Sequence, residues 1–146
     1  MINIGITGSF GKTSTKNFLY HLLKEKYYTY KTPKSYNTPM GISKVVNNEL
    51  PILSDVFIVE MGACNIGDIN ELVNLVNIDI GVITEIGPQH LETFKTIDNI
   101  LKTKLEILNS KNLKTLIINQ DNIYLRNTIY PNNIKIIKIG RKIWCL

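Results

Sequence analysis

Thr7–Ser14, which reads TGSFGKTS, is the stretch that decides the fold. An apolar run at residues 2–6 precedes it, and from residue 16 onward apolar side chains recur at helical spacing. This order predicts a strand, a glycine-containing turn and a helix, one directly after another. A strand that leads through a tight turn into a helix is the repeating unit of an α/β fold.

The residues of this turn suit the binding of phosphate and of a metal ion. Gly8 and Gly11 allow positive φ angles and let a ligand come close to the backbone. The helix that follows offers unpaired N–H groups and the positive end of its dipole to an anion. Lys12 adds a cation and Thr13 a hydroxyl. We therefore predict a P-loop, a loop that cradles phosphates, with Thr13 as a Mg²⁺ ligand.

The match to the general P-loop pattern is incomplete. That pattern has a glycine five residues before the Gly of Gly-Lys-Thr, whereas here Ile6 holds that position and Gly5 lies one residue earlier. A turn without function is the alternative, and the succession of strand, turn and helix argues against it. A dinucleotide-binding turn needs the pattern G-x-G-x-x-G, which the spacing of Gly8 and Gly11 does not provide.

Composition and charge limit the classes of function. With 44% hydrophobic and 20% charged residues, the 146-residue chain is a globular domain with a core rather than a disordered segment. The formal net charge of +5 raises a nucleic-acid-associated ATPase as an alternative. The lysines are scattered, however, and form no basic block with interleaved aromatic residues. We therefore expect small-molecule partners and no nucleic acid.

The remaining signals predict a cytoplasmic protein. Cys64 and Cys145 are far apart and form no pair with metal-ligand spacing, so reduced thiols are expected. No run of about 18 apolar residues is present, and we expect no membrane span. The N-terminus reads as the first strand, which leaves no room for a secretory signal.

Strands and helices are expected to alternate along the chain. Beyond the first strand, apolar runs predict strands at 28–32, 55–60, 80–84, 113–119 and 134–140. Helices are expected at 12–26, 42–49, 68–76 and 96–109, with a short one ending near 127. Residues 33–41 form a loop rich in turn residues, which is either functional or a plain connector. Six strands alternating with helices predict an α/β fold with a doubly wound, mostly parallel sheet, as in P-loop NTPases.

Two further side chains are expected at the same rim of the sheet as the P-loop, because ligands bind beyond the carboxyl ends of parallel strands. Glu60 ends a strand that is apolar on both faces. A carboxylate there can hold Mg²⁺ directly or through water, and a surface acid is the alternative. His90 follows the next strand and can ligate a metal as neutral imidazole, whereas a lone histidine is more often structural.

Lys104 lies inside the apolar stripe of the helix expected at 96–109, whereas Lys102 lies well away from the stripe. A lysine on an inward face is costly unless it snorkels or has a function. Desolvation lowers the pKa of a lysine and makes its amine nucleophilic. Such an amine can react with CO₂ to give a carbamate, an anion able to bind metal. A snorkelling lysine is the alternative.

Five stretches of the chain, in order, resemble the central ATPase domain of the Mur ligases, which build the peptide stem of bacterial cell-wall precursors. They are GITGSFGKTSTK, SYNTPMGIS, FIVEMGACNIGDI, GVITEIGPQHLE with the later TKLEIL, and IINQDN. The motifs EMGA…GDI and IGPQHLE are most similar to those of the type that adds D-alanyl-D-alanine to UDP-N-acetylmuramoyl-tripeptide (UDP-MurNAc-tripeptide). They are less similar to those of other family members and of the related folylpolyglutamate synthases.

The resemblance implies an ATP-dependent amide-forming ligase of peptidoglycan synthesis that uses Mg²⁺. A carboxylate of the acceptor attacks the γ-phosphate of ATP, giving an acyl phosphate and ADP, and the amine of D-alanyl-D-alanine then displaces phosphate. By resemblance, the residues expected to bind the nucleotide are Thr7, Gly8, Ser9, Gly11, Lys12, Thr13, Ser14, Asn119 and Asp121. The resemblance implies catalytic roles for Lys12, His90 and Lys104. It implies that Mg²⁺ is held by Thr13, Glu60, His90 and carbamylated Lys104. Asn37 and Thr38 are expected to face the UDP-sugar substrate.

The resemblance covers one domain of three. Family members carry an N-terminal domain that binds the UDP part and a C-terminal domain that closes over ATP and receives the amine. Residues 1–146 match the central domain alone, which usually continues past Gly140. We therefore expect a fragment that binds Mg-nucleotide weakly at best and does not complete ligation by itself. A P-loop nucleotide-binding module without ligase chemistry is the alternative.

Overall fold

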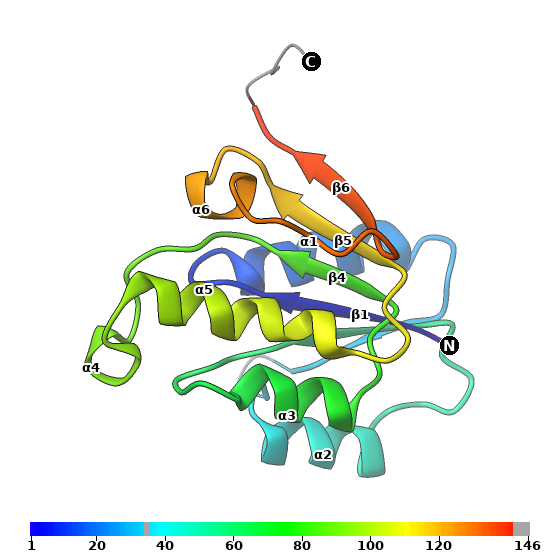
Figure 1. Cartoon of the computed structure of the whole chain (residues 1–146). Coiled ribbons are helices and arrows are strands. Elements are labelled where there is room, and N and C mark those ends of the chain that lie inside the picture. The colour runs from blue at the N-terminus through cyan, green and yellow to red at the C-terminus, as the bar shows by residue number, and fades with distance from the viewer. Residues whose placement is uncertain (34–35, 142–146) are drawn as a thin grey trace.

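The computed structural model describes residues 1–33 and 36–141, whose strands form one six-stranded sheet (Figure 1). Every neighbouring pair of strands is parallel, and the strand order is β2-β3-β1-β4-β5-β6. The predicted α/β fold with a parallel sheet is thus confirmed. The strands are β1 (Ile2–Thr7), β2 (Thr29–Lys31), β3 (Val56–Glu60), β4 (Ile80–Ile83), β5 (Thr115–Asn119) and β6 (Lys135–Ile139).

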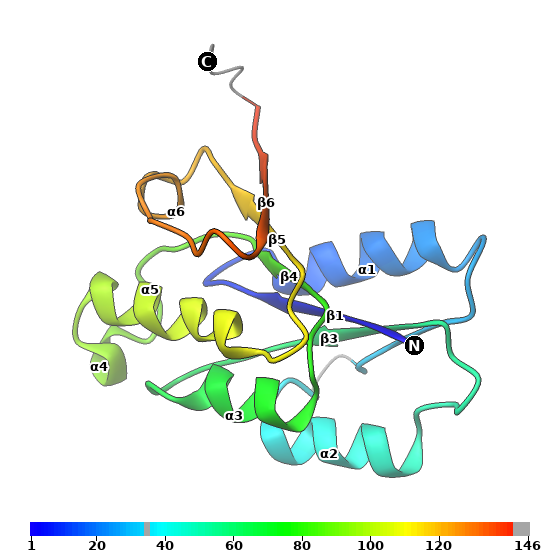
Figure 2. The ribbon, with the colours of Figure 1, turned by 45° about the vertical axis from the view of Figure 1, so that its right-hand side comes forward.

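The strand order accounts for the placement of the helices. Only the crossover from β1 to β2 runs toward the β2 edge, whereas every later crossover runs the other way. Crossovers of one hand therefore place α1 (Lys12–Leu23) on one face and α2 (Pro39–Asn48), α3 (Asp68–Leu75) and α5 (Ile97–Leu105) on the other (Figure 2). None of the helices in the described ranges is long and apolar enough to cross a membrane.

Two apolar clusters, one on each face of the sheet, form the core. The strand β3 contributes to both, because its alternate residues point to opposite faces. Phe57 and Val59 belong to the larger cluster beneath α2, α3 and α5, and Val56 and Ile58 belong to the smaller one beneath α1. All five residues of β3 are buried, so its last residue, Glu60, is buried as well. The core thus fixes an acidic side chain at the carboxyl end of the sheet.

The differences from the sequence predictions are local. The second helix begins at Pro39 rather than at 42, because Thr38 caps it and a proline suits its first position. The helix expected at 96–109 divides into α5 and the 3₁₀-helix η1 (Glu106–Asn109), and the first helix ends at Leu23. The four-residue helix α4 (Leu91–Phe94) was not predicted, because so short a helix shows no periodicity. The short α6 (Ile123–Arg126) ends close to the expected residue.

Two parts of the predictions cannot be compared with the structure. Residues 34–35 of the expected loop at 33–41 lie outside the described ranges. The same holds for residues 142–146, including Cys145, whereas Cys64 is an exposed free thiol. The first helix, all six strands and the loops that follow β1, β3 and β4 are described, and these elements build the site.

Candidate functional site

The predicted P-loop connects β1 to α1 at the carboxyl rim of the sheet. Gly8 and Gly11 adopt positive φ angles of 141° and 79°, which side chains disfavour. A Cβ atom on Gly8 would lie 2.2 Å from Oγ1 of Thr84, directly after β4. The amide of Ser9 donates to the carbonyl of Glu85 at 2.7 Å, which ties the two loops together. Glycine is therefore needed here for close contact between segments of the protein as well as for the turn.

Two hydroxyls of the P-loop make contacts within the protein. Ser9 Oγ donates to the Gly87 carbonyl at 3.0 Å and accepts from the Gly87 amide at 3.1 Å. Thr7 Oγ1 donates to the carbonyl of Met61 at 3.2 Å. Both side chains are buried, whereas Ser14 is exposed on the first turn of α1. The nucleotide-binding roles assigned to these three residues by resemblance stay predictions.

The ammonium group of Lys12 lies against its own loop. Its Nζ donates to the Gly8 carbonyl at 2.8 Å. Burial lowers the pKa of Lys12, while the negative charge of Glu60 and the thiol of Cys64 act in the opposite direction. The ammonium of Lys12 is thus held next to the P-loop, where it is available to bind a phosphate.

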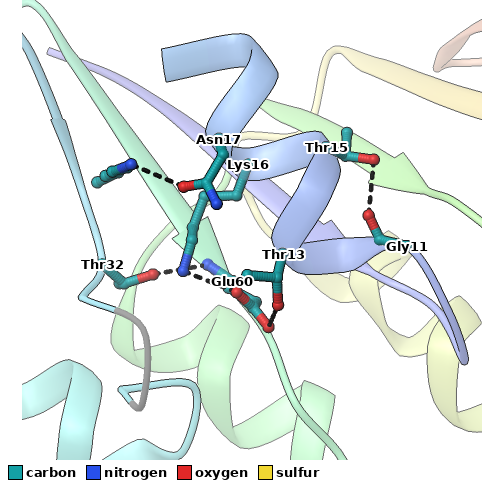
Figure 3. Close-up of polar contacts among 8 residues, drawn as sticks. Gly11, Thr13, Thr15, Lys16, Asn17, Thr32 and Glu60 are labelled. Atoms are coloured by element: carbon teal, nitrogen blue, oxygen red, sulfur yellow. Dashed lines mark hydrogen bonds and ion pairs between the residues drawn. The ribbon is translucent and has the colours of Figure 1, made fainter. Parts of the chain in front are cut away.

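The Glu60 carboxylate is held at both of its oxygens (Figure 3). Thr13 donates its hydroxyl to Oε1 at 2.9 Å, and Nζ of Lys16 forms an ion pair with Oε2 at 2.7 Å. The Glu60 amide donates to Oγ1 of Thr32 at 3.1 Å. Glu60 is only 3% exposed and Lys16 only 1%. The predicted closeness of Thr13 and Glu60 is therefore present, and a lysine that the sequence analysis overlooked completes the cluster.

A cavity of about 310 Å³ brings together residues from four segments of the chain. It is lined by Lys12, Glu60, His90, Asn37, Thr38 and Cys64, among others. The amine of residue 12, the carboxylate of residue 60 and the imidazole of residue 90 therefore share one rim of the sheet. The arrangement of parallel strands predicts this shared location, whereas the metal-binding role of His90 stays a prediction.

His90 lies at a bend in the backbone. It has φ 51° and ψ 42°, a left-handed conformation that is uncommon for residues other than glycine, and it precedes the first turn of α4. Its side chain is exposed and lines the shared cavity together with Gln89. His90 also borders a larger hollow of about 420 Å³, which is formed by residues 88–93 alone. The cavity shared with Lys12 and Glu60 is the better candidate for a functional site than this hollow, because charged groups from separate strands meet in it.

Lys104 is buried, as its place in the apolar stripe predicts. The residue is 1% exposed, and in the part of the chain that the structure describes its Nζ has no hydrogen-bond partner. The ammonium lies 5.7 Å from the centre of the Phe94 ring. Burial, helped by the positive charge of Lys12, lowers the pKa of Lys104 to about 8. Cys64 and Asp68 act on the same pKa from the shared cavity, so Lys104 lies close to that site.

Asn119 and Asp121 lie on the other side of the P-loop, in a second cavity of about 280 Å³. Thr15 and Thr84 also line it, which places it next to the P-loop. Asn119 Oδ1 accepts from the Asp121 amide at 3.0 Å, and Asp121 Oδ2 accepts from the amide of Arg141 at 2.7 Å. The structure thus brings both residues close to the first turn of α1, while their roles toward a base and ribose stay predictions.

The two predicted substrate residues are each held by a hydrogen bond from a backbone amide. The Gly62 amide donates to the Asn37 carbonyl at 2.8 Å, which joins this loop to the segment after β3. Thr38 Oγ1 accepts from the Gly41 amide at 3.3 Å and caps α2. Thr38 therefore has a structural function in addition to its place on the cavity wall.

Several polar residues of the cavity wall were not predicted: Cys64, Asp68, Glu71 and Gln89. Asp68 Oδ2 accepts from the amides of Cys64 and Asn65, both at 2.8 Å, so it orders the loop before α3. An aspartate at a helix start was the available signal. No group of three or more His, Cys, Asp and Glu side chains suited to a metal is found in residues 1–33 and 36–141.

The fold and this rim define an α/β domain of the P-loop type, in which a glycine turn leads from the central strand into the first helix. The chain belongs to the Mur ligase middle domain family, whose model matches residues 6–143. The resemblance found from five short stretches of sequence is thereby confirmed.

Individual relatives agree with the family. The chain is 35% identical over 143 residues to the UDP-N-acetylmuramoyl-tripeptide–D-alanyl-D-alanine ligase of Borreliella burgdorferi, which covers 92% of this chain and 30% of that protein. The ligase of the same name from Bacillus subtilis is 37% identical over 106 residues, 73% of this chain and 23% of that protein. The crystal structure of MurF ligase from Thermotoga maritima in complex with ADP is similar with a TM-score of 0.89 and 34% identity, over 97% of this chain and 33% of that one. This chain therefore spans no more than a third of the length of these relatives.

Proposed function

We propose that this chain is the ATP-binding part of an ATP-dependent ligase that joins D-alanyl-D-alanine to UDP-MurNAc-tripeptide. Family membership and the names of the relatives support this proposal. The observation that carries it is the shared cavity, where Lys12, Glu60 and His90 lie together at the carboxyl rim. A phosphate-binding cation and an oxygen ligand for metal are groups that phosphoryl transfer uses to neutralise charge, and the imidazole is a further group that can ligate metal.

The P-loop binds the polyphosphate of ATP. Its backbone amides and the N-terminus of α1 face the anion, and Lys12 turns from the Gly8 carbonyl to the phosphates. Thr13 and Glu60 offer a hydroxyl and a carboxylate oxygen, a donor set that fits Mg²⁺. When bound, Mg²⁺ supplies neutralisation of the charge on the phosphate oxygens. Asn119 and Asp121, next to the P-loop, lie within reach of the nucleoside.

The acceptor enters from the side of Asn37, Thr38 and His90. Its carboxylate oxygen attacks the γ-phosphorus, and the bond from that phosphorus to the β,γ-bridging oxygen breaks, so ADP leaves with the electron pair. The acyl phosphate then reacts with the amine of D-alanyl-D-alanine, which forms the amide and releases phosphate and a proton. Lys12 holds negative phosphate oxygens during the first step, and His90 orients the acceptor side of the site.

Lys104 fits the formation of a carbamate. A pKa of about 8 leaves a fraction of the amine neutral near neutral pH, and the buried ammonium lacks a hydrogen-bond partner within the described ranges. The neutral amine attacks the carbon of CO₂ and loses a proton, which gives a carbamate anion. That anion adds two oxygen donors on the side of the cavity near Asp68 and Cys64.

The first test is nucleotide binding by the 146-residue chain. Isothermal titration with ADP and Mg²⁺ should show binding, and Lys12→Ala should weaken it at least about 10-fold, since a charge-assisted hydrogen bond is lost. Lys24→Ala, on the exposed face just after α1, is the matched control and should leave the affinity unchanged. Equal affinity in the Lys12 variant and the wild type would contradict the assignment of the P-loop.

The second test is ligation in a longer protein. The chain is joined to the flanking segments of the B. burgdorferi ligase, and amide formation is measured in a coupled assay. His90→Ala and Lys104→Ala should abolish ligation while ADP binding remains, and Lys102→Ala is the control for Lys104. ADP binding without any ligation by the wild-type fusion would indicate a nucleotide-binding module instead.

A further inference from the structure

Lys16 is a buried cation that the proposed reaction does not use. It lies on α1, one helical turn beyond Lys12, and only 1% of its surface is exposed. Within residues 1–33 and 36–141, its Nζ has no hydrogen-bond partner, and its ion pair is with Oε2 of Glu60 at 2.7 Å. A buried lysine is costly unless it is paired, so this ion pair is the reason that the residue can lie there.

The pair divides the two oxygens of Glu60 between different partners. Oε2 is taken by the ammonium of Lys16, whereas Oε1 accepts a neutral hydroxyl, that of Thr13 (Figure 3). The oxygen offered to a metal ion beside Thr13 therefore belongs to a carboxylate whose charge is already neutralised. Lys12 adds a second positive charge in electrostatic contact with Glu60.

The acids on the cavity wall do not reverse this balance. Asp68 already accepts two backbone hydrogen bonds from the loop before α3. Asp68 and Glu71 line the cavity, yet they form no metal-binding group with Glu60 in the part of the chain that the structure describes. The site around Thr13 and Glu60 therefore has little negative charge of its own.

We propose that Lys16 makes metal binding depend on nucleotide. By neutralising Glu60, it keeps the affinity of the Thr13–Glu60 oxygens for a free divalent cation low. The phosphates of the nucleotide then supply the negative charge, so that metal and nucleotide enter together. Lys16 acts through Glu60 and is a positioning residue. This inference rests on the proposed function, because it assumes that Thr13 and Glu60 face the metal.

The test measures Mn²⁺, a paramagnetic substitute for Mg²⁺, by electron paramagnetic resonance. Free Mn²⁺ is titrated with the 146-residue chain without nucleotide, and Mn²⁺–ADP is titrated separately. The wild type should bind Mn²⁺ alone at least about 100-fold more weakly than Mn²⁺–ADP. Lys16→Met, which keeps the length of the side chain and removes its charge, should tighten binding of Mn²⁺ alone at least about 10-fold, as expected for one charge removed at close range.

Three further variants separate charge from shape. Lys16→Arg keeps the charge and should keep nucleotide-free binding weak. The double variant Lys16→Met with Glu60→Gln removes both charges and should lose the gain, because the gain acts through Glu60. Lys24 is exposed at the end of α1, so Lys24→Met should behave as wild type.

The outcomes decide between the two proposals. Unchanged Mn²⁺ affinity in a folded Lys16→Met variant, or a gain that persists without Glu60, would overturn the inference about Lys16. If Lys16→Met fails to fold, as judged by circular dichroism, Lys16→Gln replaces it and the same 10-fold gain is expected. If neither folds, the wild type decides, since affinities for Mn²⁺ and Mn²⁺–ADP within about 3-fold contradict the proposal. Failure of the wild type to bind ADP at all would instead contradict the proposed function.

Discussion

Ser9 and Gly87, 78 residues apart in sequence, hold each other through a reciprocal pair of hydrogen bonds. The Ser9 hydroxyl donates to the Gly87 carbonyl at 3.0 Å and accepts from the Gly87 amide at 3.1 Å. Both residues are buried. The loop that carries Lys12 and the loop that carries His90 are therefore fastened to one another before any ligand arrives.

Ser9→Ala should destabilise the protein, because it leaves the amide and the carbonyl of Gly87 buried without their partner. Such a loss costs about 1–3 kcal/mol of unfolding free energy. Urea denaturation followed by circular dichroism measures it. Ser14→Ala, on the exposed first turn of α1, is the control and should change stability by less than about 0.5 kcal/mol. Equal stability of the two variants would show that the reciprocal pair contributes nothing.

Gly8→Ala should be more damaging than Gly67→Ala, although both glycines have positive φ angles, 141° and 97°. A Cβ on Gly8 would lie 2.2 Å from Thr84 Oγ1, whereas a Cβ on Gly67 meets nothing within 4 Å. Gly67→Ala should therefore cost about 1 kcal/mol of backbone strain, and Gly8→Ala that strain plus a clash, about 2–4 kcal/mol in all. Thermal unfolding of both variants compares them, and a smaller loss for Gly8→Ala would refute the close contact of the two loops.

Lys104→Met should raise stability at pH 7 and flatten its dependence on pH. Burial lowers the folded-state pKa of Lys104 to about 8 from 10.5. Between these values the unfolded chain binds more protons than the folded one, so the stability of the wild type rises as pH increases from about 8 to 10.5. The shift corresponds to about 3 kcal/mol. Denaturation at pH 7 and pH 10 in CO₂-free buffer measures it.

Lys102→Met is the matched control for this experiment, because Lys102 is exposed on the same helix. It should leave both the stability and its slope with pH as in the wild type. A wild-type stability that stays flat or falls between pH 8 and 10 would contradict a desolvated ammonium at residue 104. A Lys104→Met variant whose stability rises with pH as steeply as that of the Lys102→Met control would contradict it as well.

Thr38→Ala should lose about 1 kcal/mol of stability, because Thr38 Oγ1 caps α2 by accepting from the Gly41 amide. Thr38→Ser keeps the hydroxyl and should retain most of that stability. Differential scanning calorimetry of the two variants separates the cap from any contact with substrate. A serine variant as unstable as the alanine variant would show that the methyl group, rather than the hydroxyl, matters.

The sheet and the location of the site follow from local sequence patterns. The apolar run that ends in Glu60 predicts a buried strand with an acid at its end, and all five residues of β3 are indeed buried. Lys104 is also buried, as its position within an apolar stripe predicts. The burial of Glu60 and Lys104 depends only on the element that carries each residue and on the side that faces the core. The pattern of apolar residues within that element is therefore enough to predict it.

The contacts between loops could not be predicted in this way. Lys16 has the spacing of any lysine on an amphipathic helix, and only the neighbouring end of β3 makes it a buried ion-pair partner. The hydroxyl of Ser9 reads as a phosphate contact, yet its partner is Gly87 on a distant loop. Asn122 likewise donates to the Ile86 carbonyl at 2.8 Å, which joins the segments that follow β5 and β4. These pairings depend on the register between strands far apart in sequence.

The strand order has a mechanical consequence. Within the shared cavity, Lys12 follows β1, Glu60 ends β3 and His90 follows β4, and each of these strands has a parallel neighbour on both sides. Interior strands open less readily than the outermost ones, because more hydrogen bonds must break at once. Fraying of β2 or β6 therefore leaves the relative positions of the amine, the carboxylate and the imidazole undisturbed. The protein keeps its reactive groups on the stiffest part of its framework and confines breathing motions to the margins.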